Sequence, residues 1–96
     1  MQNIRPISEK KWGISNHAFY QAYHFAMRYK EFKDKMIEES AKQADHQLYK
    51  YILKAVTEEG ITYKYLKTVM NIPAGKNYFY EKRRKFYYIL SKKLDD

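Results

Sequence analysis

The sequence predicts an all-α protein: a single small helical domain of four or five helices with a C-terminal helix-turn-helix. Apolar residues recur at helical spacing in several segments, no segment alternates with a two-residue period, and no Asn-Gly or Asp-Gly hairpin turn occurs. The 96 residues suit one domain. Only 20 of them are Leu, Ile, Val or Phe, whereas 11 are Tyr. We therefore expect tyrosine rings in the walls of the core and their hydroxyls at its rim.

Residues 1–14 are predicted to form an N-terminal arm, and residues 15–96 the helical domain. Pro6 and Gly13 interrupt any helical period within the arm. Ser15 suits the N-cap of the first helix, because its hydroxyl can accept a hydrogen bond from a backbone amide of the first turn. One apolar stripe then follows at helical spacing and consists of Phe19, Ala22, Tyr23 and Ala26.

The apolar stripe changes phase along this first helical segment. The change predicts a break near Tyr29 and Lys30, between a long helix and a shorter one. In one interpretation the second stripe packs on the C-terminal helices. In the other it forms a dimer interface or a docking surface for a partner such as RNA polymerase. It is rotated from the first by roughly 120°, estimated from 3.6 residues per turn, and consists of Phe25, Tyr29, Phe32 and Met36.

The middle of the chain holds a polar segment and one further helix. Residues 38–47 are polar and predict either a loop or a solvated helical turn. Asp45 suits the N-cap of the next helix, and Gly60 in the left-handed conformation suits its end. The apolar positions between them are Leu48, Ile52, Ala55 and Val56.

Residues 62–93 have the layout of a helix-turn-helix. Thr62 is placed to cap a short first helix, and a turn of three to five residues with Ile72 as its apolar plug separates this helix from a longer one. The longer helix is predicted over about residues 77–93, since Pro73 stops the first helix from continuing. In such an arrangement one face of the second helix packs on the core and the opposite face enters the major groove of DNA.

The final helix divides into a buried stripe and an outward face. The stripe consists of Phe79, Phe86 and Leu90, with Ile89 and Leu94 on its shoulders. On the outward face, Asn77 can pair with adenine and Arg84 with guanine, while tyrosine hydroxyls can donate to phosphate oxygens. The predicted DNA-binding residues are Lys64, Lys76, Asn77, Tyr78, Tyr80, Glu81, Arg84, Lys85, Tyr88 and Lys92.

Positive charge is concentrated in the C-terminal third of the chain. Residues 61–96 hold nine Lys or Arg and three Asp or Glu, whereas residues 1–60 hold ten and eight. Four adjacent cations occupy positions 82–85 of the final helix. Such clustering is the electrostatic footprint of nucleic-acid binding. A solvated face without a ligand and a contact with an acidic protein remain open as interpretations of the same charges.

Two stretches of the chain resemble small proteins encoded by phages and integrated elements of Gram-positive bacteria. They are residues 15–37, SNHAFYQAYHFAMRYKEFKDKMI, and residues 52–94, ILKAVTEEGITYKYLKTVMNIPAGKNYFYEKRRKFYYILSKKL. More distantly, the C-terminal half is similar to the helix-turn-helix of phage late transcription activators of the RinA and ArpU type and to region 4 of sigma factors. The shared pattern is a Thr-capped first helix, an apolar turn residue and a basic second helix with Arg83 and Arg84. The resemblance implies a transcriptional regulator of a phage or mobile element.

The residues required for several other chemistries are lacking. The chain has no Cys, which excludes disulfides and thiolate metal sites. His17 and His24 lie seven positions apart, which does not match the four-residue spacing of a metal-binding helix. No catalytic triad motif and no phosphate-binding loop is present. We therefore expect no enzymatic activity, no metal and no cofactor.

The lead hypothesis is a sequence-preferring protein that binds double-stranded DNA and regulates transcription, with a homodimer or a contact with RNA polymerase as further options. The alternative is a small helical module for protein–protein interaction, such as a phage-encoded inhibitor of a host protein. The sequence has no apolar leader and no apolar run of membrane-spanning length. We therefore expect the protein in the cytoplasm of a bacterial host, without a membrane partner.

Overall fold

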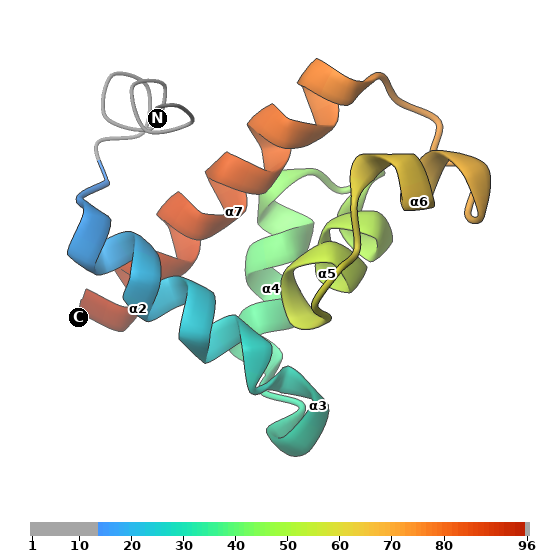
Figure 1. The fold of residues 1–96 in the computed structure, drawn as a ribbon. Helices are drawn as coiled ribbons and strands as arrows, with labels where there is room; N and C mark the ends of the chain where they lie inside the picture. Colours follow the sequence, from blue (N-terminus) through green and yellow to red (C-terminus); the bar gives the residue numbers. More distant parts are fainter. Residues whose placement is uncertain (1–13, 96) are drawn as a thin grey trace.

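The computed structural model describes residues 14–95 of the chain. No strand occurs within these residues, so the predicted all-α class is confirmed. The predicted arm, residues 1–14, lies outside the described residues except for Ile14, which is buried in the core. The helices are α2 (Asn16–Met27), α3 (Tyr29–Phe32), α4 (Lys35–Ala44), α5 (Tyr49–Thr57), α6 (Tyr63–Thr68) and α7 (Lys76–Asp95), as Figure 1 shows.

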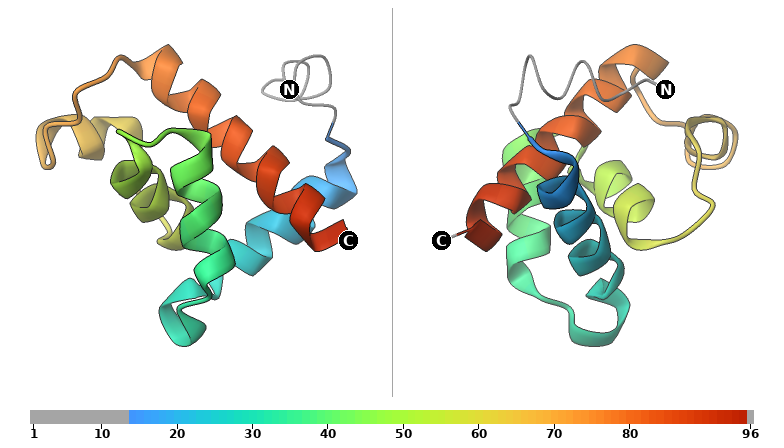
Figure 2. Two further views of the ribbon diagram at one scale, coloured as in Figure 1. Left: turned by 180° about the vertical axis from the view of Figure 1, so that it is seen from behind. Right: turned by 60° about the vertical axis from the view of Figure 1, so that its left-hand side comes forward.

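α7 is the longest of these helices, and three others pack against it. Its 20 residues run across the molecule, with α2 lying over its C-terminal half and α4 beside it (Figures 1 and 2). α5 also contacts α7. The predicted buried stripe is confirmed, because Phe79, Phe86 and Leu90 are at most 1% exposed. Tyr87 and Ser91 are buried as well, so the covered part of α7 is wider than the predicted stripe.

Small residues line the buried sides of the two helices that lie against α7. In α2, Ala22 and Ala26 are fully buried, and in α4 the same is true of Ser40 and Ala41. Because the distance between packed helices depends on the side chains at the contact, these small side chains allow close approach to α7.

Local capping interactions begin two of the helices as predicted. The Ser15 hydroxyl accepts a hydrogen bond from the amide of Ala18 at 3.1 Å, and the Thr62 hydroxyl accepts one from the amide of Tyr65 at 3.2 Å. The predicted break in the first helical segment is also present, since α2 ends at Met27 and the single turn α3 follows.

The prediction of a loop or solvated turn over residues 38–47 was wrong for most of this segment. α4 is a ten-residue helix that begins at an Asp34 cap, whose carboxylate accepts from the amide of Met36 at 2.8 Å. Its buried residues recur at the spacing of an amphipathic helix. The sequence of residues 38–47 looks polar because the side chains that this segment buries are very small. They are Ser40, Ala41 and Ala44, and the larger Ile37 lies just before the segment.

Asp45 and Gly60 flank α5 as predicted, but Asp45 caps the turn before the helix and Gly60 lies in the loop after its C-cap. One carboxylate oxygen of Asp45 accepts from the amides of Gln47 at 3.0 Å and Leu48 at 2.9 Å. It therefore caps the turn that leads into α5, not α5 itself. Gly60 has the expected left-handed conformation, with φ of 79°, but it follows an extended residue, Glu58, in the loop after the helix.

The second apolar stripe of the N-terminal segment packs mostly on the core. Phe25, Tyr29 and Met36 are half-buried against it, which agrees with the first of the two interpretations. Phe32 differs, since 61% of its surface is exposed at the end of α3. The Tyr29 hydroxyl also donates a hydrogen bond to the carboxylate of Glu38, which joins α3 to α4.

Candidate nucleic-acid interface

The connection from α6 to α7 is longer and more ordered than a minimal turn. It covers residues 69–75, whereas the sequence predicted three to five residues. Asn71 adopts the left-handed conformation with φ of 56°, and the amide of Ile72 donates to the carbonyl of Leu66 at 3.0 Å. This bond reaches back six positions, so the chain after the left-handed Asn71 is tied to a carbonyl of α6. Leu66 and the predicted plug Ile72 are both buried, so the connection is anchored in the core.

Tyr63 joins α6 to the first turns of α7. Its hydroxyl donates to the carbonyl of Ala74 at 2.6 Å. Its ring centroid lies 6.2 Å from that of Phe79 and 6.5 Å from that of Tyr80. α6 and the start of α7 therefore lie next to each other at one end of the molecule, away from α3 (Figure 1).

The predicted DNA-binding residues differ in exposure along α7. The first two residues of the helix, Lys76 and Asn77, are exposed, and Tyr78 has 49% of its surface exposed. Lys64 on α6 and Lys92 near the end of α7 are exposed too. The remaining predicted residues are half-buried, and they are Tyr80, Glu81, Arg84, Lys85 and Tyr88.

The outward face predicted around Asn77, Arg84 and Tyr88 is thus open at its N-terminal end and partly covered further along. Partial burial lowers the pKa of Arg84, with repulsion from Arg83 acting in the same sense and Glu81 opposing both. Its Nε is buried without a hydrogen-bond partner among the described residues. Arg84 remains a cation at neutral pH, because a guanidinium does not lose its proton in proteins. Glu81, Lys85 and Tyr88 each take part in an interaction already.

Tyrosine rings offset the repulsion within the basic run of α7. The Lys82 ammonium lies 5.1 Å from the centroid of the Tyr78 ring, and the Arg83 guanidinium lies 4.7 Å from that of Tyr80. Lys92 is placed likewise, 5.4 Å from the ring centroid of Tyr88. At exposed sites such a contact contributes about 0.5–1 kcal/mol. The helix can therefore carry many cations while keeping their charged groups near solvent.

Tyr78 makes a contact that the sequence did not predict. Its hydroxyl donates to Asp45 at 2.8 Å, which links the start of α7 to the turn that follows α4. Partial burial alone would raise the pKa of Asp45. The hydrogen bonds from Tyr78 and from the amides of Leu48 and Gln47, with the charge of Lys82, nevertheless hold that pKa below its ordinary value. Asp45 is therefore an ionised carboxylate beside the basic helix.

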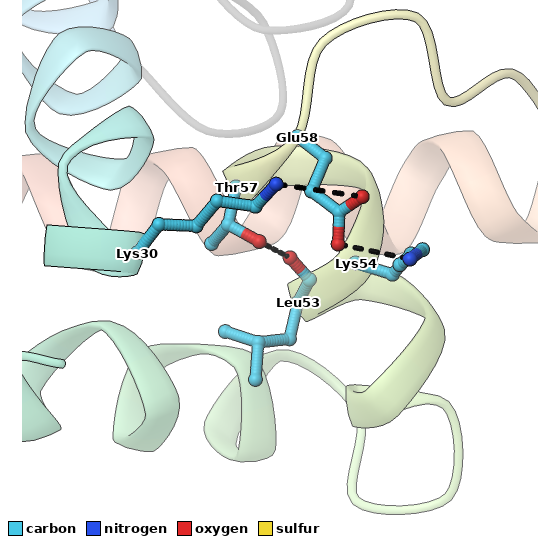
Figure 3. Close-up of polar contacts among 5 residues, drawn as sticks. All are labelled: Lys30, Leu53, Lys54, Thr57 and Glu58. Atoms are coloured by element: carbon cyan, nitrogen blue, oxygen red, sulfur yellow. Dashed lines mark hydrogen bonds and ion pairs between the residues drawn. The ribbon is translucent and has the colours of Figure 1, made fainter.

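Glu58, at the end of α5, is already paired with two lysines. Figure 3 shows Glu58 between them, with Nζ of Lys54 at 2.9 Å and Nζ of Lys30 at 3.9 Å. The neighbouring Thr57 hydroxyl donates to the carbonyl of Leu53 at 2.6 Å. An open groove of about 530 Å³ lies beside this cluster, and its lining includes Glu58, Glu59 and Arg83. Because it carries both signs of charge, the groove does not extend the cationic surface of α6 and α7.

The described residues give no sign of a metal site or of a membrane span. Within residues 14–95, no three His, Cys, Asp or Glu side chains are grouped so that they could hold a metal ion. In the same range, no helix has both the length and the apolar character needed to cross a lipid bilayer.

No protein-family model matches the chain, and neither a curated protein nor a solved structure does. The surface of this chain therefore supplies the basis for assigning a function.

Proposed function

We propose that this chain binds double-stranded DNA through α6 and α7, with α7 as the recognition helix of a helix-turn-helix. The observation that carries the proposal is the cluster of exposed polar and cationic side chains where the two helices meet. Lys64 and Lys67 are exposed on α6, and Lys76 and Asn77 are exposed at the start of α7. The contacts of Tyr63 with Ala74 and Phe79 hold α6, which carries the first two, against the start of α7, which carries the others.

The order of side chains along α7 supports this mode of binding. A recognition helix contacts base edges with its first turns and meets the phosphate backbone further along. Asn77 is exposed in the first turn and carries an amide that can pair with adenine. The cations of the later turns then serve the backbone, with Lys85 and Lys92 on the same side of the helix. Lys64 and Lys67 add phosphate contacts from α6.

The proposed regulatory role and the origin in a phage or mobile element rest on the resemblance of residues 15–37 and 52–94 to small proteins of phages and integrated elements, and on the more distant one of the C-terminal half to late transcription activators. A protein of this kind acts on transcription by occupying an operator, alone or as a homodimer, or by contacting RNA polymerase. Duplex DNA is the partner that the exposed cations favour most, since clustered positive charge attracts a polyanion and the cations outnumber the acids Asp45 and Glu81 beside them.

A salt titration tests the proposal. Fluorescence anisotropy with a labelled DNA duplex should show affinity that falls roughly a thousandfold or more between 50 and 200 mM salt, because several phosphates are neutralised. Lys76→Ala should weaken binding to all sequences and lower the salt slope by about one. Lys35→Ala is the matched control, since Lys35 is an exposed first residue of α4 at the α3 end. Equal losses in the two variants, or no salt dependence, would contradict the proposed surface.

A second function, binding of another protein, is favoured by the exposed aromatic corner at α3. The Arg28 guanidinium lies between the rings of Phe25 and Phe32, at 5.7 and 5.0 Å from their centroids. Phe32 presents an apolar ring to solvent beside this cation. Under this alternative the chain is a helical interaction module or an inhibitor of a host protein. Phe32→Ser should then abolish partner binding, whereas DNA affinity should stay unchanged under the lead proposal.

A further inference from the structure

At the start of α7, the Tyr78 hydroxyl donates a hydrogen bond to the carboxylate of Asp45. We propose that Tyr78 and Lys82 form a binding site for a DNA phosphate, and that the carboxylate of Asp45 occupies this site in the free protein. The inference rests on the proposed DNA-binding function and identifies one of its phosphate contacts. It also assigns Asp45 a role in setting the affinity for DNA.

The two carboxylate oxygens of Asp45 have separate partners. Oδ1 accepts hydrogen bonds from the amides of Gln47 and Leu48, at 3.0 and 2.9 Å, and so fixes the turn before α5. Oδ2 accepts the hydrogen bond from the Tyr78 hydroxyl at 2.8 Å. The turn therefore needs only one oxygen, and the second oxygen is directed at α7.

Tyr78, which donates to Oδ2, and Lys82, whose charge acts on Asp45, are residue types that bind phosphate in DNA complexes. Tyrosine hydroxyls and lysine ammonium groups commonly donate to phosphate oxygens. Lys82 lies one turn after Tyr78, and its ammonium is stacked over the Tyr78 ring at 5.1 Å. The half-exposed ring of Tyr78 leaves this pair accessible from solvent. The site also lies in the first turns of α7, where the helix dipole favours an anion.

Asp45 and a DNA phosphate compete for the same donors. At neutral pH the carboxylate is charged, because the Tyr78 hydroxyl, the two amides and Lys82 lower its pKa although partial burial opposes them. A phosphate that approaches Tyr78 meets this negative charge at short range. Removing the charge should therefore strengthen DNA binding, provided that the turn before α5 stays capped.

Asp45→Asn makes this change with little effect on the fold. The amide oxygen of Asn can accept from Gln47 and Leu48, since Asn caps as well as Asp does. Asp34→Asn is a matched control. Asp34 is also a half-buried cap, accepting from the amide of Met36 at 2.8 Å, but it lies at the opposite end of α4. Both variants raise the net charge by one, so a general charge effect is the same in the two.

Binding of a DNA duplex is measured for both variants between 50 and 200 mM salt. Asp45→Asn should bind about three- to tenfold more tightly at 50 mM and show a salt slope steeper by about one, which corresponds to one more neutralised phosphate. Asp34→Asn should change affinity less than twofold. Tyr78→Phe should weaken the Asp45→Asn protein more than it weakens the wild type, because the hydroxyl donates to phosphate once Asp45 no longer accepts from it. Circular dichroism checks that each variant stays folded.

Inorganic phosphate tests the site without DNA. The NMR signals of the Tyr78 ring and the Lys82 side chain should shift with added phosphate in Asp45→Asn, and not in the wild type or Asp34→Asn. If the wild type fails to bind duplex DNA, the proposed function falls, and this titration still decides whether the phosphate site exists. If Asp45→Asn binds DNA no better than Asp34→Asn, or shows no phosphate shifts, the inference is overturned while DNA binding stands.

Discussion

The two halves of α7 have the same aromatic content, two tyrosines and one phenylalanine each, but their tyrosines lie in different surroundings. Tyr78 in the first half is 49% exposed, whereas Tyr87 in the second is 5% exposed. α2 causes this difference, because the ring of Phe19 lies 4.9 Å from that of Tyr87, centroid to centroid. The same residue types therefore serve as an anchor at one end of the helix and as a surface at the other.

The comparison shows how a chain with few aliphatic residues can form a stable basic helix. The C-terminal half is held by ring packing against α2 and by the small residues of α4. The N-terminal half is joined to its neighbours by the hydroxyl of Tyr78 and by the ring of Tyr63, whose own hydroxyl holds Ala74 just before the helix. Hydrogen bonds at the edge leave the cations of the first turns accessible.

The largest expected effect is on the free energy of unfolding, and it comes from removing the buried ring of Phe86 in the second half of α7. Phe86→Ala should lower the free energy of unfolding by about 3–5 kcal/mol, because Phe86 is fully buried and its loss leaves a cavity. Urea unfolding followed by circular dichroism measures this. Phe32→Ala is the control, and it should change stability much less since that ring is 61% exposed. A small loss for Phe86→Ala would mean that the second half of α7 is not the anchor.

An intermediate effect is expected on the free energy of unfolding at alkaline pH. Burial raises the pKa of Tyr87 to about 12 from an ordinary value of 10.0, despite the nearby charge of Arg83. The stability that this neutral phenol provides is complete below pH 10 and is lost as pH rises toward about 12, because the unfolded chain ionises first. The loss should reach about 2–3 kcal/mol.

The Tyr87→Phe variant isolates this contribution. Its free energy of unfolding, measured by urea titration at several pH values above 9, should decline less steeply than that of the wild type. Tyr20→Phe is a suitable control, since Tyr20 is 57% exposed and should leave the pH dependence as it is. Parallel curves for wild type and Tyr87→Phe would show that the phenol is not protected by burial.

The smallest expected effect is on DNA sequence preference, and it compares one residue from the start of α7 with one from further along the helix. Asn77→Ala should reduce the preference for the best duplex over an unrelated one by about fivefold, roughly 1 kcal/mol, because an exposed amide that reads a base is lost. Arg84→Ala should reduce this preference less, since Arg84 is half-buried. Competition binding with selected duplexes measures both. A larger loss for Arg84→Ala would extend base reading into the second half of the helix.

The sequence predicted those features that depend on neighbouring residues. Ser15 and Thr62 bond to amides three positions on, so their caps could be predicted from local order alone. The stripe of Phe79, Phe86 and Leu90 followed from the helical period of a long segment.

Features that depend on distant packing were missed. α4 was not predicted as a helix because small residues such as Ser40 and Ala41 give a weak apolar signal even when they are buried. The bond between Tyr78 and Asp45 joins residues 33 positions apart, and it exists only because the end of α4 meets the start of α7. The partial cover over Arg84 likewise follows from tertiary structure and has no signature in the helical period.

The length of α7 has a mechanical consequence. Twenty residues at a rise of 1.5 Å make a rod of about 30 Å, while the longest extent of the molecule is 36 Å. One unbroken helix, nearly as long as the protein itself, therefore joins the exposed residues around Tyr78 to the segment that packs against α2. Because the helix between them is continuous, we expect these two regions to move as one body.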